Sequence, residues 1–285
     1  MLFRFMKYRK LSYIVSTILI ALSIFSVSTN GLNYGIDFAG GIVMEVKSKS
    51  PDFGITEMRG ALASFRPELQ EDGSGNVMIR LGLSDGSTDD AQNTIVREIR
   101  DILGDRVTYE QMQIVGPKIG AELIRGGIMA VIFAFFMMAL YIWVRYKGGY
   151  AVGALVSLFH DFILMFGFFS ATGLEFSQVA IAVILTGIGY SINDKVVNYD
   201  RIQENARKYA KMPKDELIDL SVNEMLMRTV RTSASTALVM IALWVFAGGV
   251  LGEFAMAMLF SIFMGAFSSI FISNSLLLNF ELRDN

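Results

Sequence analysis

The sequence predicts an α-helical polytopic membrane protein with six transmembrane helices and one small α/β domain between the first and second. Hydrophobic residues make up 53% of its 285 residues, and the mean hydropathy is +0.47. A soluble domain of this size is rarely so apolar. The apolar residues also gather in blocks of roughly 20, the length that crosses the hydrocarbon core of a bilayer. One polar, turn-rich stretch, residues 31–122, interrupts these blocks.

Six blocks are long enough to span a membrane. They cover residues 11–29, 123–144, 150–171, 177–198, 229–249 and 254–278. The first apolar run is longer than the ~7–15 residues of a signal-peptide core, and residues 26–31 make a mediocre cleavage site. We therefore interpret it as an uncleaved helix. The expected domains are residues 1–30, with the N-terminus and first helix; residues 31–122; and residues 123–285, five helices with a cytoplasmic loop at 199–227.

Basic residues predict the orientation of the helices. They fall at the N-terminus, after the second span and after the fourth span: Arg4, Lys7, Arg9, Lys10, Arg145, Lys147, Arg201, Arg207, Lys208, Lys211 and Lys214. These positions share one side of the membrane if six spans alternate. Short loops rich in Lys and Arg face the cytoplasm. Both termini are thus expected inside, and residues 31–122 outside.

The external stretch alternates between strand and helix patterns. Strands are expected at 42–46, 77–83 and 107–115, the second with apolar residues at every other position. Helices are expected at 55–65 and from Ser87 or Thr88 to Gly104. This order predicts two helices on one sheet. The stretch carries neither a Gly-rich phosphate loop nor a cluster of acid, base and nucleophile, so an enzyme is not expected. A stable cap and a surface that holds a polypeptide or a partner both remain open.

Composition narrows the chemistry further. The chain has no cysteine, which excludes disulfides, iron–sulfur clusters and thiolate zinc sites, and its single histidine excludes a His-rich metal site. The formal net charge of −2 gives no indication of nucleic-acid binding. No cofactor is expected, and protons are the one small species that the charged residues suggest.

Ionisable residues within the spans are few, and each costs several kcal/mol at the centre of a bilayer. His160 and Asp161 fall in the middle of the third span, Asp194 and Lys195 near the cytoplasmic end of the fourth, and Arg228 and Arg231 at the start of the fifth. Such residues usually face protein or water.

Helical spacing arranges the polar residues into stripes. Gly187, Tyr190, Ser191, Asp194 and Asn198 share one face of the fourth span, and Arg228, Thr232, Ser235 and Thr236 share one face of the fifth. Small residues in the first stripe would let a neighbouring helix approach closely. The two spans are antiparallel, so Asp194 and Arg228 lie at similar depth and could face each other.

Less specific roles are also open for several of these residues. Arg228 and Arg231 can be ordinary anchors at the cytoplasmic interface, and Lys195 is expected to extend to the headgroups. His160 can be a hydrogen-bonded structural residue that Asp161 neutralises.

Asp194 has a short side chain that reaches the interface poorly. Burial favours its neutral form and a nearby guanidinium its charged form, so a change in helix packing would make it a proton carrier. Each charge moved across the membrane is worth about 2.3 kcal/mol per 100 mV.

Four segments carry a resemblance to a known family: GLNYGIDFAGG (31–41), VGPKIGAEL (115–123), GYSINDKVVNYDRIQEN (189–205) and RTVRTSASTAL (228–238). Together, in this order, they resemble the SecF family of the bacterial SecD/SecF protein-export complex, part of the resistance–nodulation–division superfamily. The resemblance covers nearly the whole chain.

The resemblance implies partners and a function. A SecF-type subunit pairs with SecD, associates with the SecYEG channel and often with YajC and YidC, and uses the proton-motive force to promote translocation of a preprotein across the bacterial inner membrane. Its external domain is periplasmic and ferredoxin-like. Alternatives are a small-molecule exporter of the same superfamily and a purely structural membrane subunit.

The resemblance also implies residue roles. Asp194 and Arg228 match family positions in the proton path, Asn193 adjoins Asp194, and the His160–Asp161 pair is a less secure match. The other motif positions are Gly35, Asp37, Gly40, Gly41, Gly116, Pro117, Gly187, Gly189, Tyr190 and Ser191. Arg231 stands where the family motif is commonly apolar, so no role is carried onto it.

Overall fold

The computed structural model describes residues 3–50, 53–71, 75–82, 89–146 and 148–282. Ser87, Thr88 and Lys147, which entered the predictions above, lie outside these residues, as does Leu83 at the end of the second expected strand. The chain divides into two compact units, each described here by itself. The helical unit comprises Met1–Asn33, Ala130–Leu174 and Val179–Asn285, and the sheet unit comprises Tyr34–Met129 and Glu175–Gln178.

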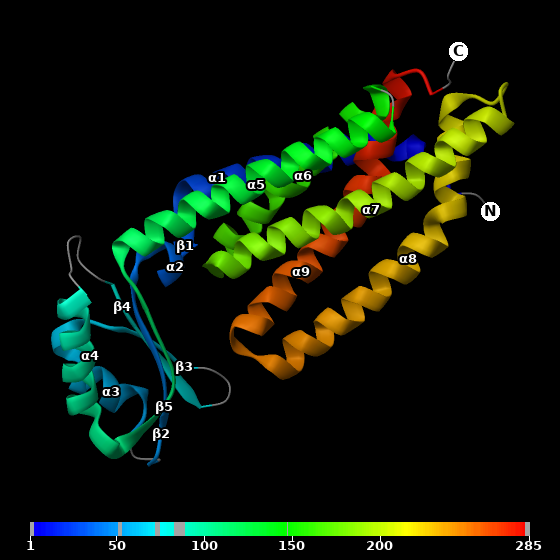
Figure 1. Ribbon diagram of the computed structural model, residues 1–285. Helices are drawn as coiled ribbons and strands as arrows, with labels where there is room; N and C mark the ends of the chain where they lie inside the picture. Colours follow the sequence, from blue (N-terminus) through cyan, green and yellow to red (C-terminus); the bar gives the residue numbers. More distant parts are fainter. Residues whose placement is uncertain (1–2, 51–52, 72–74, 83–88, 147, 283–285) are drawn as a thin grey trace. The chain divides into compact units, whose positions relative to one another are not determined.

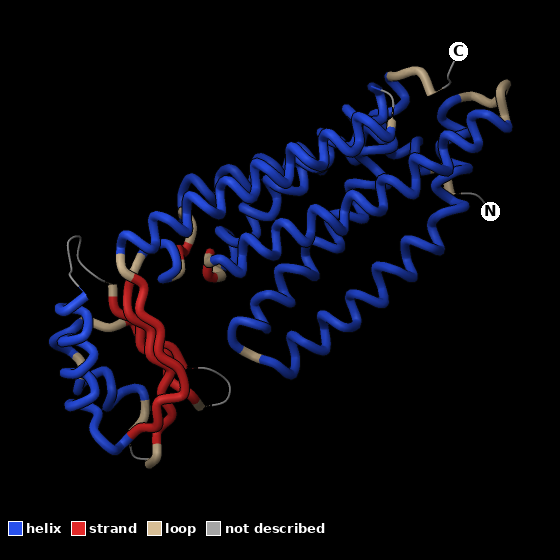
Figure 2. The backbone as a smooth tube through the Cα atoms, in the orientation of Figure 1, coloured by secondary structure: helices blue, strands red, loops and turns tan. Residues whose placement is uncertain are grey.

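Long helices dominate the described part of the chain (Figures 1 and 2). They are α1 (Arg9–Asn30), α5 (Pro117–Arg145), α6 (Gly148–Thr172), α7 (Gln178–Lys208), α8 (Lys214–Ala247) and α9 (Gly249–Phe267). A short 3-10 helix η1 (Phe5–Tyr8) precedes α1, and α9 continues into the π-helical η4 (Ser268–Ser273), then α10 (Asn274–Leu276) and η5 (Leu277–Asn279). Among the described residues, six helical segments are long and apolar enough to cross a membrane. The prediction of six transmembrane helices is therefore confirmed.

The segment 199–227, expected as a cytoplasmic loop, is instead helical almost throughout. α7 runs on to Lys208, and α8 begins at Lys214. Side chains join the two extensions: Arg201 Nε donates to Glu224 at 2.6 Å, and Asn205 Nδ2 donates to Ser221 Oγ at 3.0 Å. The expectation failed because hydropathy reports where a helix leaves lipid, whereas backbone hydrogen bonds and side-chain pairs decide where it ends.

The long helices differ in how far they are buried within the chain. In the most apolar 18-residue stretch of α6, 56% of the residues are buried within the chain. The corresponding share is 50% in α7 and 50% in the span that begins with α9. The corresponding share is 6% in both α5 and α8. α6, α7 and α9 therefore form the centre of the bundle, while α5 and α8 expose apolar side chains such as Phe133 and Phe246.

The sheet unit contains four antiparallel strands in the order β3-β4-β2-β5. These are β2 (Gly41–Ser48), β3 (Glu68–Glu71), β4 (Asn76–Leu81) and β5 (Val107–Val115). Met44, in the middle of β2, pairs with Ile79 of β4 and Met112 of β5. α3 (Ile55–Ala61) and α4 (Asp89–Leu103) both lie on one face of this sheet (Figure 1). The expected two helices on one sheet are thus present.

The core between sheet and helices follows the predicted alternation. Val77, Ile79 and Leu81 point inward from β4 and pack with Met58 and Ile99 of the two helices. Strand β3 was not predicted, because its sequence ELQE carries a single apolar residue. The expected helix 55–65 breaks at Leu62 and continues as the 3-10 turn η2 (Ala63–Phe65).

Candidate functional site

The middle of α6 carries a buried carboxylate surrounded by donors from three helical segments. We call the residues Asp161, His160, Ser191, Lys195 and Ser268 the Asp161 cluster. Asp161 Oδ2 accepts hydrogen bonds from Ser191 Oγ at 2.6 Å, Ser268 Oγ at 2.7 Å and Lys195 Nζ at 3.0 Å. Its Oδ1 lies 3.0 Å from His160 Nδ1. The cluster thereby joins α6, α7 and η4 within the helical unit.

Lys195 does not extend to the headgroups, so that prediction is wrong. Its side chain is 0% exposed. Besides Asp161, its ammonium donates to Ser191 Oγ and, at 3.1 Å, to Ser268 Oγ. The prediction rested on a span that ends at residue 198, but α7 continues to Lys208, so Lys195 is an interior position of the helix rather than its end.

Asp194, the next residue, has different surroundings. It is 4% exposed, and its Oδ2 atom has no hydrogen-bond partner among the described residues. The side chain four positions before it, Tyr190, donates through its hydroxyl to Thr236 Oγ1 of α8 at 3.2 Å. Residues four apart share a helix face. Asp194 therefore lies on the face of α7 turned toward α8, apart from the Asp161 cluster.

Arg228 and Asp194 are not in contact. Within the described residues no hydrogen bond or ion pair joins them, and Arg228 is exposed. Asn193 is exposed, away from both buried groups. The polar stripe of α8 is satisfied largely by its own backbone: the hydroxyls of Thr232, Ser235 and Thr236 each bond a carbonyl three or four residues earlier.

Close packing of α7 against α9 depends on small residues. A Cβ atom on Gly187 would overlap Ser261, and one on Gly265 would lie 3.1 Å from the Cβ atom of Ser191. Gly187 thus acts as the predicted packing residue. Gly189 is different, since nothing lies within 4 Å of the position that its Cβ would take.

The serines of η4 are functional candidates that the sequence did not reveal. Besides Ser268, Ser269 Oγ accepts from Asn198 Nδ2 at 3.0 Å, and Ser273 Oγ lies 2.5 Å from the hydroxyl of Tyr199. A π-helical turn is rare and often marks a functional site. The run SSIFISNS was a possible signal, but serines in an apolar helix commonly bond their own backbone, so the run predicts no partner.

In the C-terminal part of α7, a second polar group joins it to the end of α5. Arg145 donates to Asp200 Oδ1 at 2.7 Å, and the hydroxyl of Tyr146 donates to the same oxygen at 2.9 Å. Burial and the neighbouring carboxylate raise the pKa of Tyr146, so its phenol stays protonated and keeps donating.

The motif residues of the sheet unit shape its backbone. Gly41 has φ +153°, and a Cβ there would lie 2.6 Å from the carbonyl oxygen of Leu81. Gly40, with φ +72°, ends the short α2 (Ile36–Ala39). Pro117 is the first residue of α5, directly after Gly116. Gly40 and Gly41 therefore need glycine for conformational reasons.

Asp37 and Gly35 connect the same motif to the segment Glu175–Gln178. Asp37 Oδ2 accepts from the backbone N–H of Gln178, the first residue of α7, at 3.1 Å. The amide of Gly35 bonds the carbonyl of Phe176 at 3.0 Å, and Arg80 pairs with Glu175. In this way β1 (Asn33–Tyr34) and β6 (Glu175–Phe176) form a two-stranded sheet.

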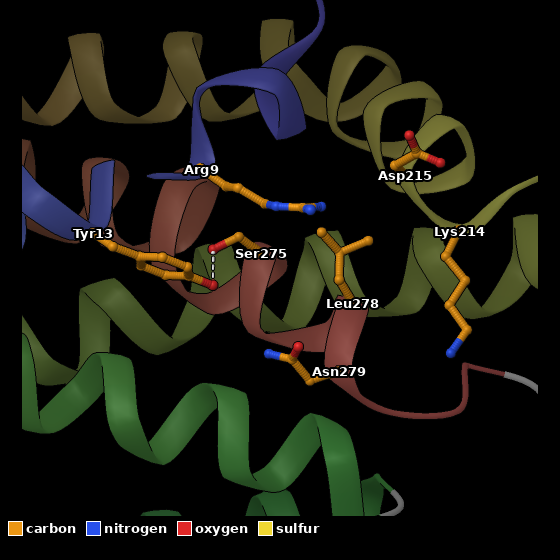
Figure 3. A pocket seen from close by; sticks show the side chains of 7 residues that line it. All are labelled: Arg9, Tyr13, Lys214, Asp215, Ser275, Leu278 and Asn279. Carbon is orange, nitrogen blue, oxygen red and sulfur yellow. Dashed lines mark hydrogen bonds between the residues drawn. The ribbon is translucent and has the colours of Figure 1, made fainter. Parts of the chain in front are cut away.

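A polar cavity of about 290 Å³ lies between α1, the start of α8 and the C-terminal helical segments. Figure 3 shows Arg9 reaching across it, with Tyr13 and Ser275 joined by a hydrogen bond of 2.8 Å. It contains none of the predicted proton-path residues. In the described part of the chain no group of three His, Asp or Glu side chains could hold a metal ion.

Family models match this chain over most of its length. Residues 95–283 match the model described as protein export membrane protein SecD/SecF, C-terminal, and residues 25–52 match the SecD/SecF GG motif. The chain is 41% identical to the protein translocase subunit SecF of Rickettsia rickettsii, over 99% of this chain and 92% of that protein. The same subunit of Rickettsia prowazekii is also 41% identical, with the same coverage.

Solved structures of SecDF proteins also resemble this chain. The crystal structure of SecDF, a translocon-associated membrane protein from Thermus thermophilus, matches with a TM-score of 0.84 and 32% identity over 97% of this chain. A second crystal structure, of SecDF in a super-membrane-facing form, matches with a TM-score of 0.72 and 32% identity over 97% of this chain. The chain spans 38% of the length of that SecDF chain. The chain belongs to the SecD/SecF family of protein-export membrane proteins, and within it to the SecF branch.

Proposed function

We propose that this chain is the SecF-type accessory subunit of a bacterial Sec translocase, which works with a SecD-type partner and uses the proton-motive force to promote protein translocation. Its likeness to SecF subunits over nearly their whole length supports the subunit role. Its match to one part of a longer SecDF chain supports the pairing with SecD. It acts as a non-enzymatic transport subunit of the inner membrane.

One observation supports proton transfer most directly: a carboxyl oxygen of Asp194 is buried without a hydrogen-bond partner in the described structure. An uncompensated charge there is costly, so burial favours the protonated form. If α7 and α8 shift so that Arg228 approaches, the ionised form gains a partner and the proton leaves. Protonation and helix packing are then linked, as a proton-driven cycle requires.

The other predicted relay residues rest on the family resemblance alone. Asn193, His160 and Asp161 make no hydrogen bond to Asp194 in the described residues. The buried Nε2 atom of His160 lacks a partner there. We rank Asn193 and His160 below Asp194 and Arg228, and Asp161 lower still, because four side-chain partners already occupy its oxygens.

Contacts at one end of the helical unit support the topology that we propose. The amide of Phe3 donates to Asn223 of α8 at 2.9 Å, and Lys214 Nζ, at the first residue of α8, donates to the carbonyl of Phe280 at 2.8 Å. Phe3 and Phe280 therefore both contact the first part of α8. With the positive-inside rule, this supports cytoplasmic termini and a periplasmic sheet unit that engages the emerging preprotein. SecYEG, YajC and YidC are the further partners we propose.

The test compares Asp194→Asn and Arg228→Met in inverted membrane vesicles that carry the SecD-type partner. We expect both variants to lose the increase in preprotein translocation that a proton gradient produces, while translocation without the gradient is unchanged. Glu204→Gln and Arg231→Met are the controls, because each removes the same charge from an exposed position of the same helix. Arg201, which pairs with Glu204, keeps its second partner Glu224. If both test variants respond to the gradient like the parent at normal complex levels, the proton-transfer proposal is wrong.

A further inference from the structure

A lysine without any solvent exposure is unusual in a membrane helix, and Lys195 has every one of its donors occupied. Its ammonium carries three hydrogens, and it contacts three oxygen acceptors: Asp161 Oδ2, Ser191 Oγ and Ser268 Oγ. No functional group of this lysine is left over for a substrate, a lipid or water. All of its hydrogen-bond donors are therefore used within the protein.

Asp161 is satisfied to a similar degree. Four side chains surround it, from its own helix α6 (His160), from α7 (Ser191 and Lys195) and from η4 (Ser268). Lys195 is the cation that ion-pairs with its Oδ2 atom. A buried carboxylate with one counter-ion and several hydrogen bonds is stable in its charged form, whereas removal of the counter-ion leaves a costly isolated charge.

We propose that Lys195 is a positioning residue: it holds Asp161 as a permanently charged partner and fastens α6, α7 and η4 into one block. Asp194, which precedes Lys195 and lies about 100° from it around the helix axis, is then the buried carboxyl of α7 that exchanges protons. This last step rests on the proposed function, whereas the ion pair and its fastening role do not. The block gives α8 a fixed surface against which to move.

The first experiment asks for the protonation state of Asp161. Infrared spectra are recorded on the purified complex with its SecD-type partner, and the variants Lys195→Met, Asp161→Asn and Asp161→Asn/Lys195→Met are compared with the parent. We expect Lys195→Met to gain a protonated-carboxyl band that is absent from the parent and from the double variant. A parent band that Asp161→Asn removes, or a Lys195→Met spectrum without a new band, would overturn the proposal.

The second experiment measures the amount of assembled complex in membranes, and it covers the case in which Lys195→Met fails to fold. We expect each single change, Lys195→Met or Asp161→Asn, to lower this amount by about tenfold, because each leaves one buried charge unpaired. The double variant removes both charges and should return to within about twofold of the parent. Lys208→Met, an exposed lysine of the same helix, is the matched control and should stay at the parent level.

The rescue by the double variant decides the second experiment. A double variant no better than the worse single variant contradicts the ion-pair role. Neither readout depends on proton-driven export, so the outcome is separate from that of the Asp194→Asn test. The inference about Lys195 can therefore fail while the proposed function stands, and the reverse also holds.

Discussion

The two sides of α7 near residue 194 contrast sharply. On the side turned to α6 and η4, Lys195 and Asp161 are buried with their polar atoms paired. On the side turned to α8, Asp194 is buried with an oxygen that has no hydrogen-bond partner in the described structure. The adjacent residues Asp194 and Lys195 thus lie in different electrostatic surroundings: the ammonium of Lys195 is paired, whereas one oxygen of Asp194 is not.

This contrast separates structural from chemical roles. A fully satisfied buried network holds helices together and resists a change of charge, since any change leaves partners unpaired. An unsatisfied buried carboxyl changes charge easily when its surroundings move. The sequence run NDK places both kinds of group next to each other, and only their partners tell them apart.

The largest expected effect is a difference in stability between two variants, Asp161→Asn and Asp194→Asn, which make the same substitution on the two sides of α7. Asp161→Asn leaves the ammonium of Lys195 without a counter-ion and should destabilise the chain by about 3–5 kcal/mol. Asp194→Asn removes no ion pair and should change stability by less than about 1 kcal/mol. Thermal unfolding of both variants in detergent micelles measures the difference. If both variants lose the same amount of stability, Asp161 and Asp194 do not differ in how they are paired.

A smaller effect is expected from the glycines of α7. Gly187→Ala places a methyl group against Ser261 of α9 and should cost about 1–3 kcal/mol through overpacking. Gly189→Ala meets no neighbour, and alanine favours helix by about 1 kcal/mol over glycine. The same unfolding measurement should therefore rank the Gly189 variant at or above the parent. A destabilised Gly189→Ala protein would contradict the assigned packing.

The smallest effect concerns the contact between α7 and α8. Tyr190→Phe removes the hydrogen bond to Thr236, and such bonds between membrane helices average about 0.6 kcal/mol. A double-mutant cycle with Thr236→Val should give a coupling energy of that size. A coupling energy of zero would mean that α8 does not stay beside this face of α7. Gradient-driven translocation by Tyr190→Phe should change little, since the hydroxyl bears no charge.

Much of the architecture could be predicted from the sequence. Apolar block length predicted six spans because the thickness of a bilayer sets the length of a helix that crosses it. Alternation predicted β4 and its inward residues, and the bounds expected for the last strand, 107–115, are those of β5. Strand β3 was missed because an edge strand with one buried residue has almost no pattern.

The candidate site was also predicted only in part. Helical spacing placed Ser191, Asp194 and Asn198 on one broad stripe, but the structure turns Ser191 and Asn198 toward α6 and η4, and Asp194 toward α8. Spacing gives the angle of a residue about its own helix and says nothing of which helix stands opposite. The sequence by itself determined the membrane class, the six spans and the unusual charges within them. Only the tertiary structure decided that Lys195 pairs with Asp161 and that Asp194 and Arg228 stand apart, because those facts depend on contacts between segments distant in the chain.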